Sequence, residues 1–335
     1  MSQTPTKTIA ILGATGNQGG SVASTFLSSP SWRVRAITRN PSSSRALALG
    51  SLGAEIVHAD MDSPSSLTSA FADVHAIFAV SNFWEIYTNP SNRSKAEAAG
   101  DPLHVWSGKQ ETEQLKRVID AAAQVSGLER FVLSSLSDVT KWSGGKYTHV
   151  YHFDSKANAE VYARERHPEL WAKTSVLQAG MFLGNYTSSM RPERTADGVV
   201  QFSGQLVPDI KLPIIAAEED TGPLVHSLVR ESAGKNLLGY REWLSMQEVV
   251  AAFADATGFK AEYVTMPKEQ ANPHFPPELQ EEIDDCMAYV NEFGYAGPDP
   301  TVVHPKDLES PPQLGSVVEW FKKQDWNKVF GEQGK

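Results

Sequence analysis

The sequence predicts an α/β protein with a doubly wound parallel sheet and a smaller C-terminal lobe. Short apolar runs alternate with helix-compatible stretches through the first half, and the first run ends in a glycine-rich turn. Strands separated by helices of this length require right-handed parallel crossovers, which build a doubly wound sheet. The alternation stops after residue 182. We therefore expect one unit over 1–182 and a mixed part over 183–335, which completes the sheet and forms a substrate lobe.

The expected strands are short and rich in apolar or β-branched residues, as buried strands are. They cover 8–13, 32–39, the end of 46–60, 75–82, 128–138 and 174–182. The helices between them cover 19–27, the start of 46–60, 63–74 and 109–127. In the last of these, one face is expected to be buried, because apolar residues recur at helical spacing. These residues are Leu115, Val118, Ile119 and Ala122.

The second part is expected to carry three further helices, over 244–258, 276–294 and 314–330. The first of them begins with Ser245 and Glu248, which have the spacing of a capping box. The terminal helix should turn Val318, Phe321 and Trp326 inward. These helices are expected to lie over the carboxyl edge of the sheet, where open α/β sheets bind their ligands.

Composition excludes several function classes. The 335 residues carry a net charge of −10, which disfavours nucleic acid as a partner. One cysteine, Cys286, allows no intrachain disulfide, and its neighbours Asp284 and Asp285 disfavour a thiolate. No stretch has the length and apolarity of a membrane helix, and the N-terminus lacks the apolar run of a signal peptide. We expect a cytoplasmic protein without membrane or nucleic-acid partners.

The clearest motif is GATGNQGG at 13–20, in the first strand-to-helix turn. Gly13, Gly16 and Gly19 permit a tight turn and a close approach of the backbone to a pyrophosphate, which then sits at the helix N-terminus. The alternative is that these glycines only pack helix against strand. The βα units that follow favour dinucleotide binding.

The end of the second strand indicates which dinucleotide binds. An acidic residue there binds the ribose 2′-hydroxyl of NAD, whereas an arginine accommodates the 2′-phosphate of NADP. Here the chain reads Thr38-Arg39-Asn40, without an acid. Arg39 is therefore the candidate clamp for the phosphate of NADP(H), and the alternative is a solvated surface arginine.

Several segments, met in order, resemble the NmrA-like family of atypical short-chain dehydrogenase/reductase proteins, in its fungal type. They are GATGNQGGSVASTFL, VRAITRNP, HADMDSPSSLTSAF, AVSNFWE, QAGMFLGNY, EEDTGPLV and LSMQEVVAAFADATG, and they span most of 7–265. The resemblance implies an NADP-preferring Rossmann domain with a small C-terminal lobe. It leaves the function open, because members include redox-sensing regulators with a protein partner, reductases and fungal tailoring enzymes, some of which assist cyclisation.

Carried over by position, the resemblance implies a cofactor site along the carboxyl ends of the strands. Its members are Gly13, Thr15, Gly16, Asn17, Gln18, Gly19, Arg39, Asp60, Met61, Val80, Ser81, Asn82, Lys156, Ala179, Gly180 and Met181. Asp60 and Met61 should lie near the adenine, and 80–82 near the ribose. Lys156 and the QAGMF turn should flank the nicotinamide.

The candidate acid/base groups come from YTHVYHFDSK at 147–156 and from the fifth strand. Ordinary members of the wider superfamily pair a serine with Tyr-x-x-x-Lys, in which tyrosine exchanges the proton. Here Lys156 is kept, but the residue four positions before it is His152. These two share a helix face, whereas Tyr151 is rotated by about 100° unless the helix begins after it. The catalytic candidates are Lys156, His152, Tyr151 and Ser135.

Three interpretations of these candidates remain open. His152 is the proton donor, because imidazole exchanges a proton near neutral pH. Alternatively, Lys156 acts alone as ribose anchor and electrostatic group beside the cofactor. The third interpretation is that the site is catalytically silent and His152 is a packed histidine. Asp154 lies off the shared face and would reach the pocket only at the helix start.

An aromatic wall is expected beside this site. Its candidates, each of which could instead pack in the core, are Phe83, Trp84, Trp142, Phe182 and Tyr186. A flat or polycyclic substrate would suit such a wall. The polar segment 85–108 is expected to be a loop that caps the pocket. The sequence lacks the spacing of zinc motifs, so no metal site is expected.

These observations favour an NADPH-dependent reductase of a C=O, C=N or C=C bond in a hydrophobic small molecule, in secondary metabolism. One alternative is an NADP(H)-sensing regulator that binds a partner protein. The other is a cyclase or isomerase, pericyclic chemistry included, that binds the cofactor in the same pocket. A small-molecule substrate is the expected partner under the first and last of these.

Overall fold

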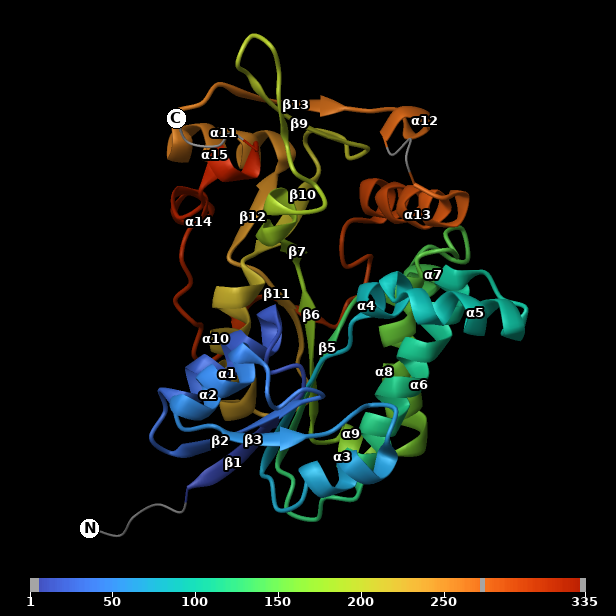
Figure 1. Cartoon of the computed structure of the whole chain (residues 1–335), viewed down its shortest axis with the longest axis vertical. Coiled ribbons are helices and arrows are strands. Elements are labelled where there is room, and N and C mark those ends of the chain that lie inside the picture. The colour runs from blue at the N-terminus through green and yellow to red at the C-terminus, as the bar shows by residue number, and fades with distance from the viewer. Residues whose placement is uncertain (1–5, 272–274, 332–335) are drawn as a thin grey trace.

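The computed structural model describes residues 6–271 and 275–331, and within these ranges one eight-stranded parallel sheet carries the fold (Figure 1). Its strands stand in the order β14-β11-β6-β5-β4-β1-β2-β3. Their bounds are β1 Lys7–Ile11, β2 Trp32–Thr38, β3 Glu55–His58, β4 Ala76–Ala79, β5 Arg130–Ser135, β6 Thr174–Ala179, β11 Asn236–Gly239 and β14 Val302–Val303. Every neighbouring pair is parallel, which confirms the predicted doubly wound sheet.

Helices cover both faces of the sheet (Figure 1). One face carries α1 Asn17–Leu27, α2 Ser44–Ser51 and α10 Ala217–Arg230, and the other carries α3 Pro64–Ala70, α6 Leu103–Ala123, α8 Tyr151–Arg166 and α9 Pro168–Trp171. The predicted inner face of the long helix is confirmed, since Leu115, Val118, Ile119 and Ala122 are all buried. That helix begins six residues earlier than predicted.

The predicted capping loop over 85–108 is wrong, because this segment is helical. It forms α4 Phe83–Thr88, α5 Pro90–Ala99 and the first turn of α6. Asn82 and Asn89 cap the first two helices with their side-chain oxygens, and Pro90 occupies the first turn of α5, where its missing N–H costs nothing. Ile86, Ala96, Leu103 and Trp106 join in a small core of their own. The segment is thus a packed helical layer.

The chain from Met181 onward supplies two strands of the large sheet, β11 and β14, and a separate lobe (Figure 1). Within the described ranges, the lobe contains two three-stranded sheets, β12-β10-β7 and β13-β9-β8. Their bounds are β7 Met181–Phe182, β8 Glu193–Arg194, β9 Val200–Gly204, β10 Lys211–Ile215, β12 Glu242–Ser245 and β13 Ala261–Thr265. The remaining helices are α7 Val139–Trp142, η1 Leu183–Thr187, α11 Met246–Thr257, α12 Lys268–Ala271, α13 Pro277–Phe293, η2 Pro305–Asp307, α14 Val317–Lys322 and α15 Trp326–Val329.

Two of the three predicted C-terminal helices agree with α11 and α13, and the capping box of Ser245 and Glu248 is present. The predicted helix over 314–330 is wrong as a single helix. Ser316 caps α14 and Asp325 caps α15, so the chain turns between them. With this register Val317 is fully buried in place of the predicted Val318, while Phe321 and Trp326 point inward as predicted.

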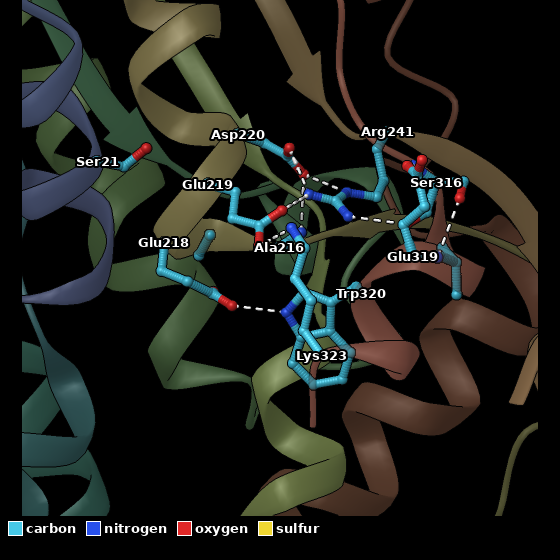
Figure 2. A network of polar contacts seen from close by, with 12 residues as sticks. Ser21, Ala216, Glu218, Glu219, Asp220, Arg241, Ser316, Glu319, Trp320 and Lys323 are labelled. Atoms are coloured by element: carbon cyan, nitrogen blue, oxygen red, sulfur yellow. Dashed lines mark hydrogen bonds and ion pairs between the residues drawn. The ribbon is translucent and has the colours of Figure 1, made fainter. Parts of the chain in front are cut away.

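A buried polar network fastens the lobe to the sheet (Figure 2). The Arg241 guanidinium is fully buried and donates to Asp220 at 2.7 and 2.8 Å and to Glu219 at 2.8 Å. It also donates to the Ser316 carbonyl at 3.0 Å. Because these residues belong to α10, to the position before β12 and to the cap of α14, the network holds the lobe over the carboxyl edge of the sheet. Bidentate pairing of this kind suits burial.

Candidate functional site

A cavity of about 770 Å³ runs along the carboxyl edge of the large sheet into the lobe. The turn between β1 and α1 lines one end, together with the ends of β2 and β3. The ends of β4, β5 and β6 and the start of α8 line its middle. Residues of the lobe, among them Leu206, Leu212 and Met287, close the other end. The place of this cavity agrees with the rule that open α/β sheets bind ligands where the strand order reverses, here between β1 and β4.

The turn from Gly13 to Gly19, called the glycine cradle below, leaves no room for a side chain on either of these two glycines. Gly13 has a φ of +62°, which favours glycine, and a Cβ there would lie 2.9 Å from Cγ1 of Val80. A Cβ on Gly19 would lie 2.2 Å from the Gly13 carbonyl oxygen. The first turn of α1 begins immediately after this cradle, and its N–H groups lack acceptors within the helix. An anionic group fits here.

Arg39 lies at the same end of the cavity, directly after β2. Its guanidinium donates a short hydrogen bond to Glu85 of α4, which also lines the cavity. This carboxylate raises the pKa of Arg39 above its ordinary value. Both side chains are at least half exposed, so the pair is easily opened. Sequence reasoning did not foresee Glu85, because the segment containing it was expected to be a loop.

Every residue predicted for the cofactor site lines the cavity. Of the catalytic candidates, Lys156, His152 and Ser135 line it as well. Tyr151 does not. Helix α8 begins at Tyr151, whose ring packs against His104 at a centroid distance of 5.0 Å and against Gly108. Asp154 is also turned away, because its carboxylate accepts from the Val139 N–H at 2.7 Å, at the start of α7.

Lys156 is held in a buried ion pair that the sequence analysis missed. Its Nζ donates to both carboxylate oxygens of Glu111 at 2.8 Å and to the His152 carbonyl at 2.8 Å. Glu111 is completely buried on α6 and also accepts from the hydroxyls of Ser81 and Ser155. A signal was available. Glu111 shares the inner helix face with Leu115 and Val118, and a carboxylate buried there requires a cationic partner.

His152 is held by a second buried carboxylate that the sequence analysis missed. Its Nδ1 lies 2.6 Å from Oε1 of Glu282, and its backbone N–H donates to the same oxygen at 2.9 Å. Glu282 comes from α13 of the lobe and is completely buried. The imidazole packs against Trp84, Phe83 and Phe153, with centroid distances of 5.0, 5.9 and 4.8 Å. A histidine fixed in this way can exchange protons with a molecule in the cavity.

The predicted aromatic wall is partly wrong. Phe83, Trp84 and Phe182 line the cavity, whereas Trp142 and Tyr186 do not. Tyr186 is buried in the core of the lobe between Phe202 and Phe321, and burial raises the pKa of its phenol. Trp142 packs against the same core, with the Lys141 ammonium over its outer face. Apolar lining comes instead from residues outside the prediction, namely Leu136, Phe153, Met190, Leu206, Leu212, Met287, Val290 and Tyr295.

Cys286 faces the lobe end of this cavity from α13. Burial raises the pKa of its thiol to about 12, so it is a protonated, apolar wall residue at neutral pH. Among the residues within 6–271 and 275–331, no three His, Cys, Asp or Glu side chains form a group that could hold a metal ion. No helix in the same two ranges is long and apolar enough to cross a membrane.

Glu160, one helical turn beyond Lys156, makes stability depend on pH. Burial raises the pKa of its carboxyl to about 7, although the Ser135 hydroxyl that donates to it opposes the rise. A carboxyl group whose pKa is raised by folding stabilises the folded state fully at pH values below its pKa in the unfolded chain, about 4.5. This stabilisation is lost as the pH rises through about 7, the pKa in the folded state. Glu160→Gln should therefore stabilise the protein at pH 8, by at most about 3 kcal/mol, and change little at pH 4.5.

Urea unfolding at pH 4.5, 6 and 8 measures this prediction. Glu165→Gln is the matched control, because Glu165 lies on the same helix but is exposed. A stabilisation of Glu160→Gln that is the same at all three pH values would contradict the prediction.

Comparison with known proteins places the fold. The model of the NmrA-like family matches residues 5–333. The NmrA-like family domain-containing oxidoreductase hkm9 of Aspergillus hancockii is 29% identical over 310 residues, which cover 88% of this chain and 87% of the relative. The solved structure of NmrA, a negative transcriptional regulator, in complex with NAD has a TM-score of 0.74 and 20% identity, and the alignment covers 96% of this chain and 95% of that chain. An NADPH-dependent quinone oxidoreductase from Escherichia coli has a TM-score of 0.64 and 19% identity, with 94% and 98% covered.

Proposed function

Because the chain belongs to the NmrA-like family, we propose that it is an NADP(H)-dependent reductase of a C=O, C=N or C=C bond in a hydrophobic small molecule. One observation carries the proposal. A single cavity joins the glycine cradle to an apolar end, and His152 and Lys156 lie on the wall between the two. The relative from Aspergillus hancockii, which is named as an oxidoreductase, supports the same reaction class.

The residues present fit the cofactor. The cradle at Gly13 and Gly19 excludes side chains and so leaves space for a pyrophosphate at the start of α1. Arg39 provides a cation for the 2′-phosphate, and no acidic residue follows β2 within 39–43. The QAGMF turn, with Gly180, lines the cavity on the side of Lys156. When bound, the cofactor would supply a hydride from its nicotinamide.

The chain's own groups would then manage the proton and the substrate. The apolar end, with Phe83, Trp84 and Phe182, would bind a flat hydrophobic molecule and exclude water. His152 would donate the proton to the substrate, because its ring lines the cavity and its Nδ1 contacts Glu282. Lys156 is paired with Glu111, so it would fix the wall of the ribose site while the carboxylate balances its charge.

Deuterium transfer tests this function. The purified protein is incubated with NADPH deuterated at C4, in each stereochemical form, and with apolar quinones, enones, ketones and imines. Loss of NADPH with one deuterium in the product is expected for one of the two forms. Product formed without NADPH loss would replace the reductase by a cyclase or isomerase. Recovery of a partner protein in only one redox state of the cofactor, without turnover, would replace it by a sensor.

Arg39 should govern the choice between the two dinucleotides. Arg39→Ala removes a charge-assisted contact to the 2′-phosphate, which is worth about 1.5–3 kcal/mol, so the Kd for NADP⁺ should rise about 10- to 100-fold. The Kd for NAD⁺ should change less than about twofold, because NAD⁺ lacks that phosphate. Isothermal titration calorimetry measures both constants.

Glu85→Gln is the matched variant, because it removes the carboxylate that pairs with Arg39 in the free protein. NADP⁺ should bind this variant more tightly than the wild type, whereas NAD⁺ should bind both alike. An Arg39→Ala variant that binds NADP⁺ as tightly as the wild type would contradict the role of Arg39.

A further inference from the structure

The strongest unassigned feature is the junction between helix α13 of the lobe and the first turn of α8. There the backbone N–H and the ring Nδ1 of His152 both point to one oxygen, Oε1 of Glu282. An N–H group can only donate, so that oxygen is an acceptor. The ring distance of 2.6 Å is as short as the shortest charge-assisted hydrogen bonds. When Glu282 is ionised it has no proton to give, so the hydrogen of this contact is then carried by Nδ1.

Burial makes this pair more than an incidental contact. Glu282 is completely buried, and among the described residues no lysine or arginine pairs with it. A carboxylate in such a place costs several kcal/mol unless it has a partner of opposite charge. His152 can be that partner when its ring is protonated. The second oxygen, Oε2, has no hydrogen-bond partner among the described residues, which leaves the ring as the principal support of the charge.

The other ring nitrogen faces the candidate site. His152 lines the cavity, and its Nε2 makes no hydrogen bond to any residue within the described ranges. The hydrogen bond that one ring nitrogen makes fixes which nitrogen carries the proton in the neutral ring. With Nδ1 donating to Glu282, the neutral ring has its lone pair at Nε2. Free neutral histidine prefers the opposite form, with the proton on Nε2.

We propose that Glu282 is a positioning residue, which holds His152 as the Nδ1–H form so that Nε2 exchanges the proton with substrate. This rests on the proposed reductase function. In the reducing direction the imidazolium gives its Nε2 proton to the substrate, which gains a hydride from NADPH in the same reaction. The substrate is reduced by one hydride and one proton, and NADPH becomes NADP⁺. The ring is left neutral as the Nδ1–H form and regains its proton from solvent.

The pairing also assigns a role to the lobe. Glu282 lies on the same face of α13 as Cys286 and Val290, which line the cavity. His152, in contrast, belongs to a helix of the large sheet layer. The proton donor is therefore completed only when α13 packs against α8. A substrate that fills the apolar end touches the same helix that orients the histidine.

The form of the His152 ring is measured directly by long-range ¹H–¹⁵N spectra of the full chain labelled at histidine. The chain has nine histidines, and His152→Phe identifies the signal that belongs to His152. We expect the Nδ1–H form in the wild type and in Glu281→Gln. Glu281 is the matched control, because it neighbours Glu282 in sequence but is half exposed. Glu282→Met, which removes the acceptor at similar volume, should shift the ring to the Nε2–H form.

Activity supplies the second measurement, on the substrate found by deuterium transfer. Glu282→Gln keeps an acceptor oxygen but removes the charge that supports the imidazolium, so kcat should fall about 10- to 100-fold with KM and the Kd for NADP⁺ unchanged. A wild-type ring in the Nε2–H form overturns the proposal without any variant, as does a Glu282→Met ring that stays in the Nδ1–H form. Absence of hydride transfer with the Nδ1–H form present would instead reject the reductase function.

Discussion

Gly19→Ala is expected to weaken dinucleotide binding by about 100-fold or more and to lower the stability of the protein. A Cβ at this position would lie 2.2 Å from the carbonyl oxygen of Gly13, 2.5 Å from its carbonyl carbon and 2.8 Å from the Ala14 nitrogen. All three atoms are backbone, so the turn itself must move. Overpacking of this kind costs about 1–3 kcal/mol, and the upper value corresponds to roughly 100-fold in a dissociation constant.

The neighbouring Gly20 provides a control, because its replacement by alanine should raise the stability of the protein instead of lowering it. A Cβ at Gly20 would meet only the Ala14 carbonyl oxygen, at an ordinary contact distance of 3.5 Å. Gly20 lies within α1, where alanine is favoured over glycine by about 0.5–1 kcal/mol. Gly20→Ala should therefore bind NADP⁺ like the wild type and unfold at a higher temperature. Calorimetric titration and thermal unfolding measure both variants, and equal behaviour of the two would contradict the account of the turn.

Lys156→Ala is expected to destabilise the protein by about 3–5 kcal/mol, because it leaves the Glu111 carboxylate buried without a cation. The two serine hydroxyls that also donate to Glu111 cannot neutralise its charge. Denaturant unfolding measures the loss. A drop in turnover of Lys156→Ala would report partial unfolding as well as any contact with the cofactor ribose.

Two further variants separate these effects. Adding Glu111→Gln to Lys156→Met removes the buried charge while it keeps acceptors for Ser81 and Ser155, so most of the stability should return. Lys109→Ala, on the same helix as Glu111, breaks an exposed pair with Asp101 and should cost less than about 1 kcal/mol. If Lys156→Ala were no more destabilising than Lys109→Ala, the buried pair would not support the fold as described.

The sequence was sufficient for the parts of the fold that depend on local pattern. The strands β1 to β6 are apolar runs next to helices, and crossovers of this length make neighbouring strands parallel. The strands β11 and β14 were not predicted, and β14, with two residues, is too short to carry a periodicity. The helices over 83–99 were missed because their sequence is mostly polar and was taken for a loop. The helix-start signals, two asparagine N-caps and Pro90 in the first turn of α5, were overlooked.

The parts of the candidate site that are formed by residues of one continuous segment could be predicted from the sequence. The glycine turn and Arg39 belong to that class. The two carboxylates that hold Lys156 and His152 were missed, because each comes from a different helix. Both nevertheless left a signal, since Glu111 and Glu282 each share a helix face with apolar residues, Leu115 and Val118 in one case and Cys286 and Val290 in the other. An acid on an expected inner face predicts a buried partner of opposite charge. Which residue that partner is depends on packing between helices, which local sequence does not contain.

The central claim is that the cavity at the carboxyl edge of the sheet is an NADP(H) site. Calorimetric titration of the wild-type protein with NADP⁺ and, separately, with NAD⁺ tests it most directly. The account predicts one site per chain and a Kd for NADP⁺ at least about tenfold lower than that for NAD⁺, since one charge-assisted contact is worth that much. Equal constants for the two dinucleotides, or no binding of either, would contradict it.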